Sequence, residues 1–432
     1  MEWPADSPGL LFWFAPILQT TTSSEEDSAT PVLQNTLTHQ NYIRHPYPRR
    51  FFSFSSTYYI NTYNIMTSTP YQINKPFRIA VIGSGNWGTA VAKIVAENCS
   101  EKSDIFEKQV NMWVFQEQIG ERNLTDIINT EHENVKYLPD VKLPENLVAN
   151  PDIVETAKDA DLLIFNIPHQ FLPRICKQLE GKVSPNVRAI SCLKGIEVNE
   201  HNCKLLSQSI TDTLGIYCGV LSGANIANEV ARGRWSETSV AYNVPDDFRG
   251  HGEDIDEFVL KELFHRSYFH VRVIKDVVGA SIAGALKNVV ACAAGFVEGA
   301  GWGDNAKAAI MRIGLKETIH FASYYEKFGI QGASPDYKTF TEESAGVADL
   351  ITTCSGGRNV KVARYMIENK CDAWAAEAKL LNGQSSQGII TVKEVHKLLQ
   401  NFGLQDEFPL FEATYAVIYE SADVNDWPIV LQ

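Results

Sequence analysis

The segment 83–88 reads GSGNWG and has the glycine spacing of a loop that binds the pyrophosphate of a dinucleotide. Gly83 allows the tight turn out of the preceding strand, and Gly85 lets bare backbone approach a pyrophosphate. Gly88 lets the following helix pack closely on the sheet, and the N–H groups of its first turn attract phosphate. A purely structural turn is the alternative, because glycine-rich turns are common. The apolar strand before the motif and the helical pattern after it favour a dinucleotide site.

Lys287 and Asn288 lie in the middle of an apolar, Ala- and Gly-rich stretch from Asp276 to Val297, which we predict to be a long helix. Burying an ammonium group is costly and lowers its pKa, which suits a group that exchanges protons. The alternative is a lysine whose stem covers apolar surface while its tip reaches water. The adjacent Asn288 favours a polar cleft, and the pair argues against a membrane span.

Lys194 follows the buried strand that we predict over 187–192. Ligands of doubly wound sheets bind at the carboxyl ends of the strands, so a lysine there is placed for function. A solvated lysine at a strand end is the alternative. His169 follows another predicted strand, but no acid lies near it in the sequence, and we assign it no catalytic role. Asp349 either caps a helix or pairs with a lysine in the cleft.

A second anion site is indicated by Gly356 and Gly357, which come directly before Arg358 and a predicted helix. A helix N-terminus offers free N–H groups to an anion, and a guanidinium can form two parallel hydrogen bonds to phosphate oxygens. The alternative is a capped helix with an arginine on its surface.

From Phe77 onward, short apolar runs alternate with helical stretches, and we predict strands over 78–82, 110–115, 161–167, 187–192 and 217–222. This alternation is typical of a parallel, doubly wound sheet with both faces covered. Beyond Val273 the sequence becomes helical. We therefore expect an α/β protein in which an N-terminal Rossmann-like doubly wound domain (77–273) is followed by an all-α C-terminal substrate domain (274–432).

The composition fits two soluble domains, because 432 residues are too many for one ordinary core. The net charge of −14 argues against nucleic acid or an anionic membrane as a main partner. No apolar run reaches the roughly 20 residues that span a bilayer, so we expect no integral membrane protein. The eight cysteines form no C-x-x-C pair, which predicts free, buried thiols, and we assign no metal ligands.

Residues 1–76 are rich in Ser, Thr, Pro, Tyr and Phe and have no sustained helical period, so we predict that they are mostly disordered. No acidic residue occurs between Ser28 and Ala96, and Arg49 and Arg50 lie in that stretch, as in a mitochondrial transit peptide. The acidic first 27 residues argue against such a leader, and Met66 is an alternative start. We expect a cytoplasmic protein, with mitochondrial import through this extension as the alternative.

Together, these motifs resemble the NAD-dependent glycerol-3-phosphate dehydrogenases of the eukaryotic soluble type, and fungal members most of all. The matching stretches are GSGNWGTAVAKIVAENC, HENVKYLP, NIPHQFLPRIC, SCLKG, LSGANIA, GALKNVVA, ESAGVADLITTC, GGRNVKVA and LLNGQSSQG. They extend from about Phe77 to Phe411 and are specific as a set. The resemblance implies reversible hydride transfer between NADH and dihydroxyacetone phosphate, giving sn-glycerol 3-phosphate, and it implies a homodimer.

The resemblance also implies roles for single residues. Lys287 is the expected general acid/base, Lys194 a second catalytic lysine, and Asp349 the carboxylate that orients the ammonium of Lys287. The expected substrate-binding residues are Lys194, Asn288, Thr353, Arg358 and Asn359. The expected NAD-binding residues are Gly83, Ser84, Gly85, Asn86, Trp87, Gly88, Phe115, Phe171, Lys194, Ala227, Arg358 and Gln387. No ribose-binding acid ends the second strand at Phe115, so NAD rather than NADP rests on family precedent and on the lack of an arginine cluster there.

Two other functions stay open at this point. One is a hydroxyacid or hydroxyacyl dehydrogenase with the same two-domain plan, which the GGRN motif and the pair of lysines disfavour. The other is a catalytically idle NAD-sensing protein, which the presence of both lysines and Asp349 disfavours.

Overall fold

The structure is a computed structural model that describes residues 71–199, 201–381 and 386–431. The extension that we predicted to be disordered or to target the protein covers residues 1–76, of which residues 1–70, with the alternative start at Met66, lie outside the described residues, as does part of the LLNGQSSQG stretch. Residues 71–76, which we assigned to the extension, contact the folded chain. Tyr71 donates a hydrogen bond to Asp256 (2.6 Å) and stacks on Phe258.

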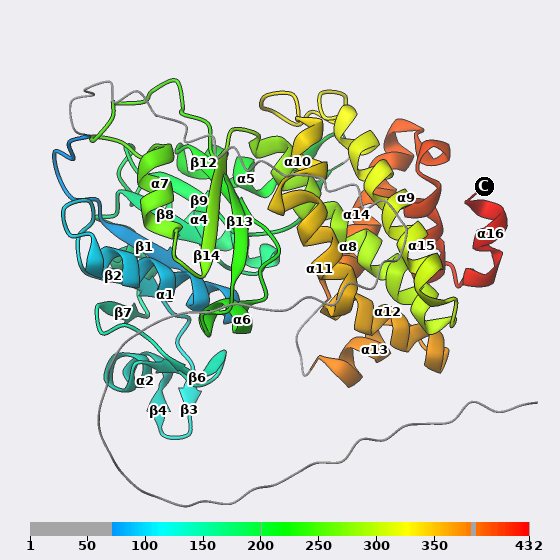
Figure 1. The fold of residues 1–432 in the computed structure, drawn as a ribbon, viewed down its shortest axis with the longest axis horizontal. Helices are drawn as coiled ribbons and strands as arrows, with labels where there is room; N and C mark the ends of the chain where they lie inside the picture. The colour runs from blue at the N-terminus through cyan, green and yellow to red at the C-terminus, as the bar shows by residue number, and fades with distance from the viewer. Residues whose placement is uncertain (1–70, 200, 382–385, 432) are drawn as a thin grey trace, which may run out of the picture. The chain divides into compact units, whose positions relative to one another are not determined.

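An eight-stranded sheet forms the N-terminal half of the described chain (Figure 1). Its strands, in spatial order, are β14 (Phe269–Ile274), β13 (Ser236–Ala241), β12 (Cys218–Ser222), β9 (Arg188–Ser191), β8 (Leu162–Phe165), β1 (Ile79–Ile82), β2 (Val110–Trp113) and β7 (Leu147–Asn150). The six strands from β12 to β7 are parallel to one another. The five predicted strands coincide with β1, β2, β8, β9 and β12, and the Rossmann-like prediction is confirmed.

The last two strands run against the other six, which the sequence did not predict. β13 is antiparallel to β12, and β14 is parallel to β13. Only 13 residues, 223–235, connect β12 to β13, and they hold the five-residue helix α6 (Ala227–Ala231). Parallel neighbours need a crossover of about a dozen residues or more, so the length of this connection alone does not fix the direction of β13. A buried apolar run does not report the direction of its strand.

Helices cover both faces of the sheet, as alternate residues of β1 show. Ile79 and Val81 pack with α1 (Asn86–Glu101) and α7 (Glu257–Phe264), whereas Ala80 and Ile82 pack with α3, α4 and α5. The remaining elements of this half are β3 (Gln118–Ile119), β4 (Arg122–Asn123), α2 (Leu124–Glu131), β5 (Glu133–Asn134), β6 (Leu138–Lys142), α3 (Ile153–Ala157), η1 (His169–Phe171), α4 (Leu172–Leu179), β10 (Ile196–Val198), β11 (Cys203–Leu205) and α5 (Leu206–Leu214).

The helix α8 (Val277–Gly299) is the centre of the C-terminal half, and Figure 1 shows it among α9, α11, α12 and α14. Asp276 caps its N-terminus by accepting the N–H of Gly279 (2.7 Å). The helix is long and apolar enough to cross a membrane, but 94% of its apolar window is buried inside the protein. A core helix of this kind confirms the prediction over 276–297.

The other elements of this half are α9 (Gly303–Ser323), α10 (Tyr337–Thr341), the π-turn η2 (Ser344–Ala348), α11 (Asp349–Gly356), α12 (Arg358–Asn369), α13 (Ala373–Leu380), α14 (Gln387–Phe402), η3 (Gln405–Glu407), α15 (Pro409–Tyr419), η4 (Val424–Asp426) and α16 (Trp427–Val430). Glycine allows α12 to lie directly on α8, because a Cβ at Gly295 would lie 2.5 Å from the carbonyl oxygen of Val360. All eight cysteines are free and seven of them are buried, as predicted.

A buried ion pair ties β9 to the segment before α7. Arg188 donates two hydrogen bonds to Asp254 (3.0 and 2.6 Å), and Arg249 also pairs with this carboxylate. Burial raises the pKa of Asp254, but the hydrogen bonds from the two arginines outweigh burial and hold that pKa well below its usual range.

We expect Asp254→Asn to lower the free energy of unfolding by about 3 kcal/mol, because it leaves a buried guanidinium without its main counter-charge. Thermal unfolding measures this as a lower Tm. The matched control is Glu180→Gln, which breaks the exposed Lys177–Glu180 pair and is expected to change stability by less than about 0.5 kcal/mol. Equal shifts for the two variants would contradict a structural role for Asp254.

Candidate active site

Two lysines and one carboxylate meet where the sheet contacts the helical half. The Nζ of Lys194 lies 2.6 Å from Oδ2 of Asp349, and the Nζ of Lys287 donates to Oδ1 of the same carboxylate. Lys287 and Asp349 are buried, with 6% and 2% of their surfaces exposed, whereas Lys194 remains partly exposed. The alternative of a Lys287 tip in water is therefore wrong, and Asp349 pairs with the lysines instead of acting as a helix cap.

The burial of this cluster changes its acid–base properties. Burial lowers the pKa of Lys287 to about 7, with a further lowering by the charge of Lys194, while Asp349 opposes both effects. Burial alone raises the pKa of Asp349, but the two ammonium groups outweigh it and bring that pKa below its usual value. Near neutral pH, the cluster thus holds an ionised carboxylate beside an amine that can gain or lose a proton.

Three elements position the cluster. Lys194 follows β9 and precedes Gly195, whose φ of +141° is a conformation that other residues rarely adopt. Lys287 lies in mid-α8, one turn after Gly284, and a Cβ at Gly284 would lie 3.2 Å from the hydroxyl of Ser222 at the end of β12. The absence of a side chain at Gly284 therefore lets α8 lie directly on the carboxyl edge of the sheet.

Asp349 begins α11 directly after the π-turn η2 and is held by neighbouring hydroxyl groups. Ser222 donates to Oδ2 and Thr353 to Oδ1, each at 3.4 Å. Thr353 is one turn further along α11, so its place beside the cluster follows from the helix geometry.

A chain of hydrogen bonds leads from α8 to α12 and α14 beside this cluster. Asn359 donates through Nδ2 to Oδ1 of Asn288 (2.8 Å). Its own Oδ1 accepts the hydroxyl of Ser386 (2.6 Å) and the N–H of Gly388 (3.0 Å). Both asparagines are buried, and these hydrogen bonds fix the orientation of their side-chain amides.

Arg358 begins α12, with Gly357 as the N-cap, so the predicted helix N-terminus is present. The side chain is exposed, yet desolvation by the surrounding protein lowers the pKa of its guanidinium. This combination is typical of a cleft, and the group stays protonated at neutral pH. Because Asn359 contacts Asn288, the N-terminus of α12 lies next to the part of α8 that carries Lys287.

The glycine loop has the geometry that its spacing predicts. Gly83 has a φ of +112°, and a Cβ there would lie 2.5 Å from the carbonyl oxygen of Asn166. A Cβ at Gly88 would lie 2.3 Å from the carbonyl oxygen of Gly83, so α1 packs tightly on the loop. At Gly85, the N-cap of α1, no atom of the described residues lies within 4 Å of the Cβ position, apart from Gly85 itself, its chain neighbours and its own helix. Open backbone at a helix N-terminus fits a dinucleotide pyrophosphate.

Family models match both halves of the chain. The model described as NAD-dependent glycerol-3-phosphate dehydrogenase N-terminus matches residues 78–247, and the corresponding C-terminus model matches residues 276–428. The chain belongs to the NAD-dependent glycerol-3-phosphate dehydrogenase family.

Fungal relatives and solved structures agree with this family. The chain is 74% identical over 368 residues (85% of this chain, 99% of the relative) to glycerol-3-phosphate dehydrogenase (NAD⁺) 2 of Candida albicans. It is 60% identical over 359 residues (83% and 80%) to a Saccharomyces cerevisiae enzyme with the same name, described as mitochondrial. A solved Saccharomyces cerevisiae glycerol-3-phosphate dehydrogenase is similar at a TM-score of 0.78 and 59% identity, covering 83% of this chain and all of that one.

The family's other expected NAD contacts lie on several elements. Phe115 follows β2 and Phe171 ends η1 after β8, and both rings are exposed, by 65% and 50%. Exposed aromatic rings at the carboxyl edge of a sheet suit contact with a flat ligand. Ala227 begins α6, next to Asn228, which accepts a hydrogen bond from Asn86 (3.0 Å).

The side chain of Trp87 is partly buried and packs against the core, with its ring 6.2 Å from the ring of Phe269. Its contact with NAD stays a prediction. Gln387 begins α14 in the helical half, and the structure joins it to His169 of η1 by a hydrogen bond of 2.5 Å.

Sequence reasoning missed several polar residues that hold the site. Asn134 donates to the carbonyl oxygen of Ser84 (2.9 Å) and to the hydroxyl of Thr89 (2.8 Å), which fixes the glycine loop from inside. Ser222 and Ser386 hold Asp349 and Asn359. Asn134 lies in HENVKYLP, one of the stretches that carry the family resemblance, but the resemblance gave Asn134 no role.

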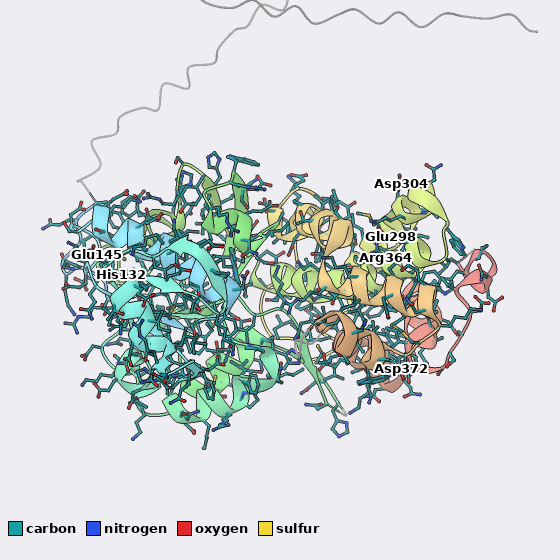
Figure 2. All side chains as sticks on the ribbon, turned by 90° about the horizontal axis from the view of Figure 1, so that it is seen from below. His132, Glu145, Glu298, Asp304, Arg364 and Asp372 are labelled. Atoms are coloured by element: carbon teal, nitrogen blue, oxygen red, sulfur yellow. The ribbon has the colours of Figure 1, made fainter. Side chains whose placement is uncertain are left out.

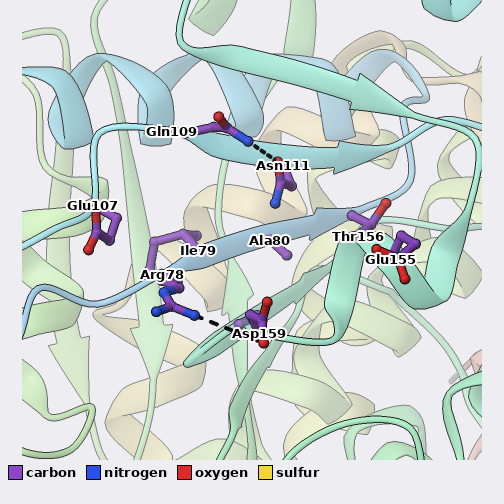
Figure 3. A pocket seen from close by; sticks show the side chains of 10 residues that line it. Arg78, Ile79, Ala80, Glu107, Gln109, Asn111, Glu155, Thr156 and Asp159 are labelled. Atoms are coloured by element: carbon purple, nitrogen blue, oxygen red, sulfur yellow. Dashed lines mark hydrogen bonds and ion pairs between the residues drawn. The ribbon is translucent and has the colours of Figure 1, made fainter.

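A hollow elsewhere on the sheet is separate from this site. It is lined by Arg78, Glu107, Gln109, Asp159 and neighbours (Figure 3). Arg78 directly precedes β1, so the hollow lies at the amino ends of the strands, whereas Lys194 follows the carboxyl end of β9. Ligands of doubly wound sheets bind at the carboxyl ends, so we assign it no role in the reaction.

Proposed function

We propose that this chain catalyses reversible hydride transfer between NADH and dihydroxyacetone phosphate, giving sn-glycerol 3-phosphate. The observation that carries the proposal is the buried Lys287, paired with Asp349 and placed beside Lys194. Family membership and the open backbone at Gly85 support NAD as the cofactor. We also propose 77–273 as the dinucleotide domain and 274–432 as the substrate domain, with the site between them.

In the reducing direction, Lys287 donates a proton to the oxygen of the substrate carbonyl as negative charge develops on it. Bound NADH supplies the hydride that the carbonyl carbon receives. In the oxidising direction, the neutral amine of Lys287 takes the proton of the C2 hydroxyl. A pKa of about 7 suits both directions, because either form of the amine is populated near neutral pH.

The neighbouring groups have separate tasks. Asp349 orients the ammonium of Lys287, and the charge of Lys194 favours the release of its proton. Arg358, Asn359 and the N-terminus of α12 bind the phosphate, while Asn288 and Thr353 contact the three-carbon unit. Binding the remote phosphate positions the reacting carbon, so the phosphate contributes to the rate as well as to affinity.

The test is NADH oxidation by the purified chain with three substrates. We expect turnover with dihydroxyacetone phosphate and none comparable with hydroxypyruvate or acetoacetyl thioesters. A preference for either of the latter would favour a hydroxyacid or hydroxyacyl dehydrogenase. NADH binding without turnover of any substrate would favour an idle NAD-binding protein.

The rate should depend on pH through Lys287. Reduction needs the protonated amine, so kcat/KM for dihydroxyacetone phosphate should fall as pH rises through about 7, and the oxidation rate should rise over the same range. Asp349→Asn removes the charge that raises the pKa of Lys287, so the fall in kcat/KM should occur at lower pH. Lys194→Met removes a charge that lowers this pKa, so the fall should occur at higher pH. Shifts of the same sign in both variants would contradict this assignment.

We propose a cytoplasmic location, with mitochondrial import as the alternative, and a homodimer. Fusing residues 1–65 to a fluorescent reporter tests the location: cytosolic signal is expected, and mitochondrial signal would overturn the proposal. Deleting the same residues should leave kcat unchanged, because the described contacts of the folded chain begin at Tyr71. Sedimentation equilibrium tests the dimer, since a monomeric mass would contradict it.

A further inference from the structure

One hydrogen bond joins the dinucleotide side of the site to the substrate side without involving the charged cluster. Nδ1 of His169 and Oε1 of Gln387 lie 2.5 Å apart, although 218 positions separate the two residues in the sequence. His169 begins η1, four positions after the end of β8 at Phe165, and Gln387 begins α14. The bond therefore connects the carboxyl edge of the sheet to the helical half.

On the sheet side, the imidazole of His169 lies beside the turn that carries Lys194. A Cβ at Gly195 would lie 3.9 Å from Nδ1 of His169, so the ring is next to the residue that follows Lys194. The ring is partly buried, and the next residues, from Leu172, continue as α4 into the core of this face. His169 is thus anchored to the same edge that holds Lys194.

On the helical side, the neighbours of Gln387 are fixed to the substrate site. Ser386 and Gly388 both donate hydrogen bonds to Oδ1 of Asn359, and Nδ2 of Asn359 donates to Asn288. A Cβ at Gly388 would lie 2.5 Å from the sulfur of Cys292 and 2.8 Å from the carbonyl oxygen of Asn288, so this segment lies directly against α8. A shift of Gln387 therefore displaces groups next to Lys287.

We propose that His169 is a positioning residue that acts through Gln387. The Nδ1–H of His169 holds the N-terminus of α14 at a fixed position relative to the turn at Lys194 and Gly195. The inference rests on the proposed function, in which cofactor and substrate bind on the two sides that this bond joins. Loss of the bond lets the two sides slip relative to each other while each keeps its own ligand contacts. Gln387 is one of twelve expected NAD contacts, so the expected consequence is a lower kcat with only a small change in NADH affinity.

The geometry specifies which atom matters. Oε1 of Gln387 accepts, so Nδ1 of His169 carries the proton and donates, a tautomer assigned from this partner. Asparagine carries an N–H₂ donor at the δ position, close to where Nδ1 lies, whereas glutamine carries its donor one atom further out. His169→Asn therefore keeps the bond, and His169→Gln and His169→Ala lose it.

The test compares these three variants in the full chain. We expect kcat for dihydroxyacetone phosphate reduction to fall about tenfold in the Ala and Gln variants and to stay within about threefold of the parent in the Asn variant. The Kd of NADH, measured by fluorescence without substrate, should stay within about twofold in all three, which also shows that they fold. His320→Ala is the matched control, since His320 pairs with Glu407 on the surface and should not affect kcat.

A double-mutant cycle with Gln387→Leu separates a positioning role from a general loss of structure. If His169 acts only through Gln387, adding His169→Ala to Gln387→Leu should cause no further loss of kcat. The inference would be overturned if the fold-losses in kcat of the two single variants multiplied in the double variant. It would also be overturned if His169→Asn were as impaired as His169→Ala. Activity of the parent chain reports on the proposed function by itself, whereas the comparison among variants reports on His169.

Discussion

Lys287→Ala is expected to lower kcat for dihydroxyacetone phosphate reduction by about 10²–10⁴-fold, which is the contribution of a positioned general acid. The Kd of NADH should stay within a few-fold of the parent value. The reason is the place of the ammonium group, which is buried against Asp349 in mid-α8, whereas the glycine loop that we assign to the dinucleotide precedes α1. Steady-state kinetics and NADH fluorescence give the two values.

Three comparisons make this prediction specific to proton transfer. Lys287→Arg keeps a positive charge that does not exchange its proton near neutral pH, so it should be as inactive as the alanine variant. A small primary amine in solution should restore part of the activity of Lys287→Ala, in proportion to its concentration. Lys316→Ala, on the exposed side of α9, is the control and should be fully active. A folded Lys287→Ala enzyme with a tenth of the parent kcat would remove Lys287 from this role.

The sequence predicted those parts of the site that are local in the chain or lie at strand ends. Two of the three glycines meet a requirement that only glycine satisfies: the structure has the predicted turn at Gly83 and the predicted close packing at Gly88, while Gly85 leaves open backbone. Lys194 could be placed because it follows a recognisable buried strand. The interruption of an apolar helix marked Lys287. Pairing with a lysine was one of two alternatives for Asp349, and the fold shows that this pair forms.

The sequence did not indicate hydrogen-bond partners that lie far apart along the chain. Asn134, 50 positions after Ser84, fixes the glycine loop, and His169 contacts Gln387 across 218 positions. His169 was set aside because it has no acid nearby in the sequence, yet its partner is an amide from the other half of the protein. A polar residue in a loop gives no indication of the distant group that it will contact.

The strands β13 and β14 were not predicted at all, because polar residues interrupt both of them: their sequences are SETSVA and FHVRVI. Burial would not have given their direction, since both strand directions satisfy it equally. The 13-residue connection between β12 and β13 does not determine the direction either, because a crossover needs about a dozen residues or more. The reversal leaves the carboxyl ends of β8, β9 and β12 side by side, so the site itself was still predictable.

Arg358→Ala should weaken use of dihydroxyacetone phosphate by about 2–4 kcal/mol in kcat/KM, through the loss of a charge-assisted contact with the phosphate. The guanidinium lies at the N-terminus of α12, beside Asn359 and hence close to Asn288. Dihydroxyacetone, which has no phosphate, should lose much less. The comparison of kcat/KM for the two substrates gives the phosphate-specific part of the effect.

Arg364→Ala is the matched control for this prediction. Arg364 lies on the same helix and pairs with Glu368, with about half of its side chain exposed (Figure 2). Its removal changes the net charge of the protein by the same amount, so a general electrostatic effect on an anionic substrate would affect both variants alike. We expect only Arg358→Ala to discriminate between the phosphorylated and unphosphorylated substrates. Equal losses for both substrates would show that Arg358 acts on the cofactor or the fold, because neither of these distinguishes the two compounds.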